Sequence, residues 1–190
     1  MLNHKGTTKI NTNRLELRKF KLDDVNDMFE NWANDKVVTK FLPWKPHGNS
    51  DVTKEIISQW INEYENNNVY NWAIELKEIG EVIGSISIVK LEENHFSCEV
   101  GYCMSRNYWG KGIMSEALKE VIDYLFSEVG LNRIEARHDT NNRASGKVMS
   151  KSGMKYEGTL RQAKLRDYTE FYDLSIYAIL KDDWIENGQQ

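Results

Sequence analysis

The sequence predicts an α/β protein, more narrowly an α+β arrangement, with one mixed central sheet of about seven strands and roughly four helices. Short segments alternate polar and apolar residues, which is typical of strands, while longer segments repeat apolar residues at helical spacing. Along the chain they follow the order strand, two helices, three strands, helix, strand, helix and two strands, which favours one sheet covered by helices. The length of 190 residues, with no linker or repeat, indicates a single domain over residues 1–190 with its core at about 14–184.

The N-terminal half is expected to contain one strand and two helices. Residues 14–20 alternate as a half-buried strand, and Asp23 and Asp24 are suitable caps for a helix that runs to about Asn34. Ser50 is expected to cap a second helix over residues 52–65. The segment between the helices holds both prolines of the chain and is expected to be an ordered loop that shapes a pocket.

The C-terminal half is expected to supply the remaining six strands and two helices. Gly130 and Gly153 are placed to end the two helices, the second of which Asn142 caps. The predicted strands are residues 70–77, 81–91, 97–104, 133–138, 156–166 and 170–180, and the longer helix begins at residue 113.

Charge and composition exclude several classes of function. The formal net charge of −4 argues against a dedicated nucleic-acid-binding protein, which is usually basic. No apolar run approaches about 18 residues, and the N-terminus has no signal-peptide core, so we expect a cytoplasmic protein without a membrane span. Cys98 and Cys103 lie five residues apart on opposite faces of one strand and cannot pair. The four histidines lack metal-ligand spacing, so no metal is expected.

The most informative segment is residues 106–118, where a glycine-containing loop joins a strand to an amphipathic helix. Gly110 and Gly112 let the backbone approach a ligand, and the N–H groups of a helix N-terminus suit a phosphate. The Walker and dinucleotide patterns do not match, because Gly112 follows Lys111 and Ser115 stands where the third glycine would be. On its own, the loop is equally compatible with a simple tight turn.

Further motifs give the loop a context. They are residues 107–112, 116–118, Asn142 with Ser145, 151–154, 156–161, 172–173 and 177–184. Together these motifs resemble the GNAT superfamily of acetyl-CoA-dependent N-acetyltransferases, in particular the bacterial branch that contains the RimJ/RimL-type ribosomal-protein N-terminal acetyltransferases. The resemblance covers residues 14–184, nearly the whole chain. It implies a GNAT-like fold, acetyl-CoA as co-substrate without a metal, and a primary amine of a protein N-terminus or a small molecule as acceptor. Many relatives dimerise, so a homodimer is possible.

The resemblance also implies a set of cofactor-binding residues. They are Cys103, Met104, Ser105, Tyr108, Trp109, Gly110, Lys111, Gly112, Ile113, Met114, Ser115, Asn142, Ser145 and Lys151. The sequence departs from the family pattern at two positions. Asn107 replaces the first Arg or Gln of the loop, and Met149 replaces the tyrosine that often acts as general acid. Ser145 is the predicted substitute for that acid, and a backbone N–H between Cys103 and Ser105 is expected to stabilise the oxyanion.

Glu99 is the predicted general base or substrate-orienting group. It shares a strand face with Gly101 and Cys103, and a carboxylate in an apolar strand is costly unless it is exposed or used. The structural alternative is a sheet residue paired with an arginine such as Arg137. Trp44, in the proline-containing loop, is the predicted contact with the acceptor amine.

Two other functions remain open at this point. One is an acetyltransferase for antibiotics or polyamines, which would favour an acidic cleft; Glu30, Asp35 and Glu63 are too dispersed in the sequence to reveal one. The other is a non-catalytic acyl-CoA-binding regulatory domain, which the missing tyrosine motivates.

Overall fold

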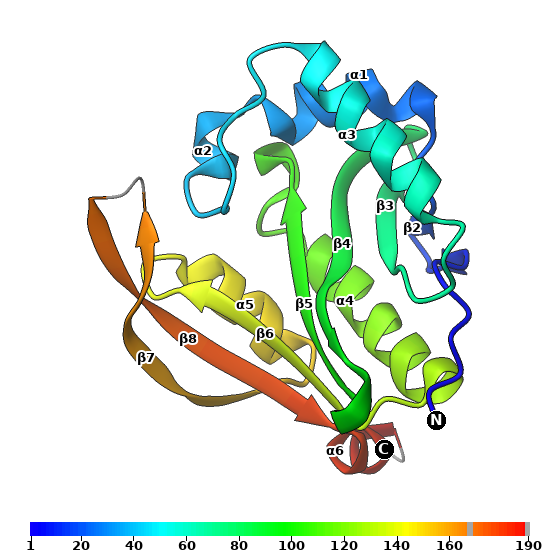
Figure 1. Ribbon diagram of the computed structural model, residues 1–190, viewed down its shortest axis with the longest axis vertical. Helices are drawn as coiled ribbons and strands as arrows, with labels where there is room; N and C mark the ends of the chain where they lie inside the picture. Colours follow the sequence, from blue (N-terminus) through cyan, green and yellow to red (C-terminus); the bar gives the residue numbers. More distant parts are fainter. Residues whose placement is uncertain (167–168, 189–190) are drawn as a thin grey trace.

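The fold is built on one mixed sheet of eight strands, in the order β1-β2-β3-β4-β5-β6-β8-β7, in a computed structural model (Figure 1). The structure describes residues 1–166 and 169–188. The strands are β1 (Ile10–Asn11), β2 (Leu15–Arg18), β3 (Asn71–Leu76), β4 (Glu81–Glu92), β5 (Ser97–Met104), β6 (Arg133–Asp139), β7 (Lys155–Arg166) and β8 (Glu170–Leu180). The α-helices are α1 (Val25–Met28), α2 (Lys36–Thr39), α3 (Ser50–Glu63), α4 (Ile113–Tyr124), α5 (Arg143–Lys151) and α6 (Lys181–Gly188).

The predicted mixed sheet is confirmed. The structure also contains three short elements beyond those predicted. β1, α2 and α6 were not expected from the sequence. The cap of α3 differs from the prediction: the side chain of Asn49, not Ser50, accepts a hydrogen bond from the N–H of Val52 at 3.2 Å. The helix expected from Asp23 is also less regular, because α1 continues into a π-helical turn, Phe29–Ala33.

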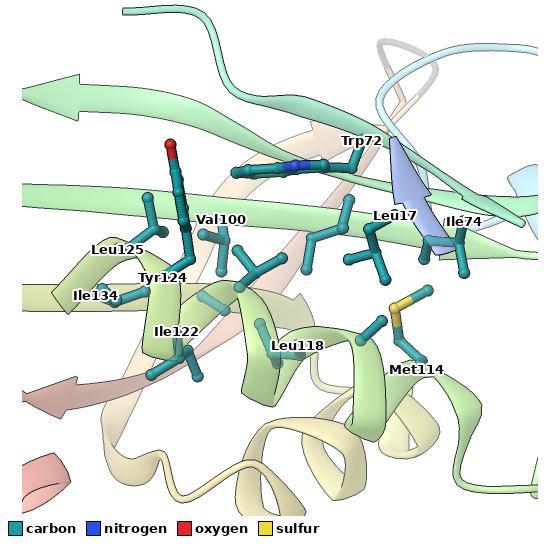
Figure 2. Packing of buried hydrophobic residues seen from close by; sticks show 14 of the residues in the cluster. Leu17, Trp72, Ile74, Val100, Met114, Leu118, Ile122, Tyr124, Leu125 and Ile134 are labelled. Atoms are coloured by element: carbon teal, nitrogen blue, oxygen red, sulfur yellow. The ribbon is translucent and has the colours of Figure 1, made fainter. Parts of the chain in front are cut away.

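The main core lies between α4 and one face of the sheet (Figure 2). Met114, Leu118 and Ile122 project from α4 at helical spacing, and all three are almost fully buried. They pack in one cluster with sheet residues that include Trp72 and Val100. Burial of such side chains is the main favourable term in folding, about 1.5–3 kcal/mol for each large apolar group. This packing fixes where α4 begins and therefore where the glycine-containing loop lies.

A parallel pair of strands in the middle of the sheet separates. All neighbouring strands pair antiparallel except β5 and β6, which run parallel. Their ladder joins Ser97–Val100 of β5 only to residues 133–136 of β6. Beyond Val100 the two strands diverge toward α2 (Figure 1). The end of β5 and the loops around it consequently border an opening in the sheet.

Candidate active site

Two adjacent cavities lie around the end of β5. The first, of about 500 Å³, is bordered by β5, the loop before α4, α5 along its length and the α2 segment. The second, of about 550 Å³, lies among α1, α3, β4 and the loop that contains Trp44. Leu42, Tyr102 and Cys103 line both cavities. Groups bound in the two cavities would therefore both lie near these three side chains.

The glycine-containing loop forms the floor of the first cavity. Gly110 and Gly112 both have φ of +76°, a left-handed conformation that costs other residues roughly 1–2 kcal/mol. The first helical bond of α4 runs from the N–H of Glu116 to the carbonyl of Gly112 at 3.0 Å. The N–H groups of the three preceding residues, Ile113, Met114 and Ser115, therefore have no intrahelical acceptor, and all three residues line the cavity. Together with the positive end of the helix dipole, they suit an anionic group such as a pyrophosphate.

A clamp of polar side chains holds this loop from behind. The guanidinium of Arg14 donates to the carboxylate of Glu116 at 2.7 Å and to the carbonyl of Lys111 at 3.0 Å. Thr12 also donates to Glu116. These hydrogen bonds lower the pKa of Glu116, against a desolvation effect that raises it. The loop is thus ordered without any side chain filling the cavity.

The end of β5 provides one backbone N–H group that points away from β4. The N–H of Ser105 donates to the carbonyl of Ile83 at 2.8 Å, so it is occupied by the sheet. Along a strand of an antiparallel ladder, successive N–H groups point alternately toward and away from the partner strand. The N–H of Met104 therefore points away from β4, toward the opening between β5 and β6. Of the range predicted for an oxyanion donor, Met104 has the suitable orientation and Ser105 does not.

The N-terminus of α5 brings two predicted residues to the first cavity. The side chain of Asn142 caps the helix by accepting from the N–H of Ser145 at 3.4 Å, and both residues line the cavity. Met149, in the position of the family's tyrosine, is instead buried in the main core. The hydroxyl of Ser145 lies 2.9 Å from the hydroxyl of Tyr102, a residue that the sequence did not single out.

One face of α5 is basic. Arg143, Lys147 and Lys151 follow one another at intervals of four residues, and all three line the first cavity. None of them pairs with a carboxylate among residues 1–166 and 169–188, and that cavity has no Asp or Glu in its described lining. Of the three, only Lys151 was predicted from the sequence; the four-residue spacing was the signal for the other two.

Most of the predicted cofactor-binding residues line the first cavity. They are Cys103, Met104, Tyr108, Trp109, Gly110, Gly112, Ile113, Met114, Ser115, Asn142, Ser145 and Lys151. Ser105 and Lys111 are not in the described lining. Ser105 is buried, and the ammonium of Lys111 lies over the Tyr108 ring at 5.1 Å from its centroid.

The second cavity has several aromatic side chains in its lining. Trp44, the predicted acceptor contact, lines it together with Trp32, Trp60 and Tyr70. Of its described lining residues, Glu63 is the single carboxylate and Lys90 the single lysine. His47 also lines it, and burial lowers the pKa of this imidazole, which lies 2.8 Å from the hydroxyl of Thr53.

Glu99 lies on β5 beyond both cavities. Its carboxylate is 3.4 Å from the guanidinium of Arg137, which also donates to Glu135 at 2.7 Å. It shares a strand face with Gly101 and Cys103, and Cys103 reaches both cavities while Glu99 lines neither in the described structure. The geometry thus contains the ion pair that the structural alternative requires. A catalytic role for Glu99 has to act across the distance from this pair to the cavities, for example through water.

The cysteines are free, and the described residues hold no candidate metal cluster. Burial raises the pKa of the Cys103 thiol to about 11, so at neutral pH it is a protonated thiol and not a nucleophile. Among the helices of the described chain, none is long and apolar enough to cross a membrane.

Comparison with known proteins identifies the fold and the family. The model of the acetyltransferase (GNAT) domain matches residues 14–155. A relative named uncharacterized N-acetyltransferase p20, from Bacillus licheniformis, is 33% identical over 174 residues, which is 91% of this chain and 96% of the relative. The ribosomal protein uS5-alanine N-acetyltransferase of Escherichia coli (strain K12) is 26% identical over 184 residues, 93% of this chain and 92% of that protein.

A solved structure shares the fold. It is described as RimL, a ribosomal-protein alpha-N-acetyltransferase in complex with coenzyme A, and it matches with a TM-score of 0.82 at 21% identity, over 93% of this chain and 99% of that one. The family model covers more than half of the chain. The two relatives, both named as N-acetyltransferases, match this chain over most of their own length. The chain therefore belongs to the GNAT family of acetyltransferases, and its relatives include ribosomal-protein acetyltransferases.

Proposed function

We propose that the protein transfers the acetyl group of acetyl-CoA directly to a primary amine, most specifically to the α-amino group of a protein N-terminus. The observation that carries the proposal is the pair of cavities that meet at Leu42, Tyr102 and Cys103. One cavity has an anion-binding helix terminus, and the other has an apolar, aromatic lining. This arrangement fits a phosphate-bearing thioester on one side and an amine on the other.

The first cavity suits acetyl-CoA. The N–H groups at the start of α4 would bind the pyrophosphate, and the basic face of α5 would bind further phosphate oxygens. RimL, whose fold this chain shares, is described with coenzyme A bound. In the proposed reaction the amine nitrogen attacks the thioester carbonyl, the C–S bond breaks, and one proton of the nitrogen ends on the sulfur. The N–H of Met104 would stabilise the oxyanion, and Ser145 would deliver a proton to the departing thiolate.

The second cavity favours an acceptor with an apolar neighbour over a polycation. A polyamine or aminoglycoside carries several positive charges, which require several carboxylates for recognition. The described lining supplies Glu63 alone, with Lys90 of opposite charge. An α-amino group has a pKa of about 8, so about a tenth is neutral at pH 7, far more than for a lysine amine at about 10.4. Both considerations favour a peptide N-terminus, the substrate class named for the relative from Escherichia coli.

The alternative of a non-catalytic acyl-CoA-binding domain rests on the loss of the family's tyrosine. The thioether of Met149 has no proton to donate, and the side chain is buried in the core, so this position cannot supply an acid. A thiol is acidic, about 8.5 for free cysteine, and its departure does not demand a strong acid. The second cavity, which shares three lining residues with the first, favours the catalytic interpretation, since a domain that only senses the cofactor does not need an acceptor cavity.

Release of thiol from acetyl-CoA, measured with a panel of acceptors, tests the proposal. The panel contains peptides with different first residues, ribosomal-protein N-termini, spermidine and kanamycin. We expect turnover with peptides and little with the polycations. The opposite preference would indicate the small-amine function, and saturable acetyl-CoA binding without turnover would indicate the regulatory one. Absence of binding would refute the whole proposal.

A further inference from the structure

Tyr102 and Ser145 form a pair of hydroxyl groups at the junction of the two cavities. Tyr102 comes from β5 and Ser145 from the first turn of α5, on the opposite side of the opening in the sheet. Their hydroxyl oxygens are 2.9 Å apart, and the tyrosine hydroxyl also lies 3.0 Å from the backbone carbonyl of Ser145. Tyr102 lines both cavities, and Ser145 lines the first.

The two distances allow two arrangements of the protons, because a tyrosine hydroxyl has a single proton to donate. In one, Tyr102 donates to the carbonyl of Ser145, and the serine hydroxyl donates back to Tyr102. In the other, Tyr102 donates to the serine oxygen, and the serine proton is free to point into the first cavity. Only the second arrangement lets Ser145 donate to an atom of a bound molecule.

The surroundings of Tyr102 keep it a donor. Burial raises the pKa of its hydroxyl well above the ordinary value of about 10, and the hydrogen bond with Ser145 opposes this only in part. The phenol therefore remains protonated across the physiological pH range and does not act as a base.

We propose that Tyr102 is a positioning residue for acetyl transfer: its hydroxyl donates to the oxygen of Ser145 and thereby directs the serine proton toward the thioester sulfur. The inference rests on the proposed acetyl transfer. Tyr102 supplies a phenol hydroxyl from β5, on the other side of the cavity, whereas α5 has Met149 at the position where the family has a tyrosine. Tyr102 loses no proton in this step; the proton that reaches the sulfur comes from Ser145, which regains one from the attacking nitrogen through solvent.

A double-mutant cycle tests the inference on the full-length protein. Tyr102→Phe removes the hydroxyl and keeps the ring. We expect kcat to fall about 10-fold, below typical acid–base contributions of 10²–10⁴, because Tyr102 acts only through Ser145 and the thiol leaves readily. The Kd for acetyl-CoA should change less than about 3-fold, a difference of under 1 kcal/mol. Ser145→Ala should lower kcat by at least as much. Tyr156→Phe is the matched control, since Tyr156 is exposed, outside both described linings, and bonded through its hydroxyl to Thr159 at 2.8 Å.

The decisive variant combines Tyr102→Phe with Ser145→Ala. The backbone carbonyl of residue 145 remains available in Ser145→Ala, so a purely structural hydrogen bond from Tyr102 would still be lost in the double variant. Positioning of the serine hydroxyl predicts no further loss of kcat, whereas a structural role predicts that the two losses multiply and that acetyl-CoA binding weakens. Two results would overturn this inference while leaving the proposed function in place, provided that the wild type turns over. One is an unchanged kcat in Tyr102→Phe, and the other is a double variant in which the two losses of kcat multiply. Absence of wild-type turnover on every acceptor overturns the proposed function with it.

Discussion

Glu99 illustrates at the residue scale how one side chain fits two roles. Its carboxylate is only partly exposed and lies beside Arg137, which is a sufficient reason for an acid to occur in this strand. Its parallel neighbour in the sheet is Glu135, which contacts the same guanidinium at 2.7 Å. The hydrogen bond with Glu135 and the charge of Glu99 both raise the pKa of Arg137. The two carboxylates therefore share one ion-pair environment, but Glu99 lies on the strand that reaches the cavities.

These two carboxylates allow a paired test of the proposed base; they differ in that Glu135 also accepts a hydrogen bond from Arg133 at 3.1 Å. Glu99→Gln and Glu135→Gln each remove one carboxylate from Arg137 at constant size. If Glu99 deprotonates the amine through water, Glu99→Gln should lower kcat/KM for the acceptor about 100-fold, the lower end of typical general-base effects, while Glu135→Gln stays within about 3-fold of wild type. Steady-state rates and the Kd for acetyl-CoA are the measurements. If both variants change kcat/KM by the same small factor, Glu99 has no catalytic role and serves only in the ion pair with Arg137.

At the scale of the element, α5 combines three tasks in nine residues. Its inner face carries Met149 in the core and Gly146, where an added Cβ would lie 2.7 Å from the ring of His138. Its first turn carries Ser145 beside Tyr102. The third face carries Arg143, Lys147 and Lys151 along the first cavity. The close approach at Gly146 places this basic face at the edge of the opening between β5 and β6.

A charge reversal on that face should weaken cofactor binding. Lys147→Glu replaces attraction to a phosphate by repulsion, and we expect the KM for acetyl-CoA to rise about 10-fold, equivalent to 1.4 kcal/mol, at low ionic strength. The effect should shrink at 0.5 M salt, where exposed charges are screened. The control is Lys54→Glu on α3, an exposed lysine outside both described linings. An equal change in both variants would assign the effect to net charge and not to α5.

Elements with regular hydrophobic periodicity were predictable from the sequence. The apolar spacing of α4 and the alternation of β5 both appear as expected, including the division of β5 into a face with Glu99 and a face with Tyr102. The short elements were not predictable. α2 has only four residues with two valines, which do not favour helices, and the side chain of Asp35 begins it by accepting from the N–H of Val37 at 2.7 Å.

The candidate site likewise has features that could be predicted from the sequence and features that could not. The glycine-containing loop was recognisable because glycine at positive φ and a helix start are local features. The pair of Tyr102 with Ser145 was not, since the two residues are 43 positions apart and meet only because β5 and β6 separate. The second cavity likewise depends on packing among α1, α3 and β4, which no single segment encodes.

At the scale of the whole molecule, the sheet behaves as two parts joined by a short parallel ladder. One part contains β1 to β5 with α4, and the other contains β6 to β8 with α5 (Figure 1). Four residue pairs, from Ser97 with Arg133 to Val100 with Ala136, connect them within the sheet. The first cavity is lined from both parts, so a ligand bound there contacts both and should stabilise their arrangement.

Binding of acetyl-CoA or coenzyme A should therefore raise the melting temperature, and the loop glycines allow a controlled test. At about 100 times Kd a ligand that binds only the native state adds about 2.7 kcal/mol, which corresponds to roughly 5–10 °C for a chain of this size. Gly112→Val should lose this shift, because a β-branched residue at φ of +76° would displace the backbone at the start of α4, whose N–H groups are proposed to bind the phosphates; an added Cβ there lies 3.7 Å from the guanidinium of Arg14. Gly80→Val is the matched control: Gly80 has φ of +70°, close to the +76° of Gly112, but it lies in the turn between β3 and β4 with no atom within 4 Å of an added Cβ. Both variants pay a similar backbone strain and should melt lower than wild type without ligand. Differential scanning calorimetry measures the ligand-induced shift in melting temperature. If Gly112→Val retains the shift, the assignment of the loop to the cofactor is wrong. If the shift is lost in Gly112→Val but kept in Gly80→Val, the loss comes from blocked binding and not from reduced stability.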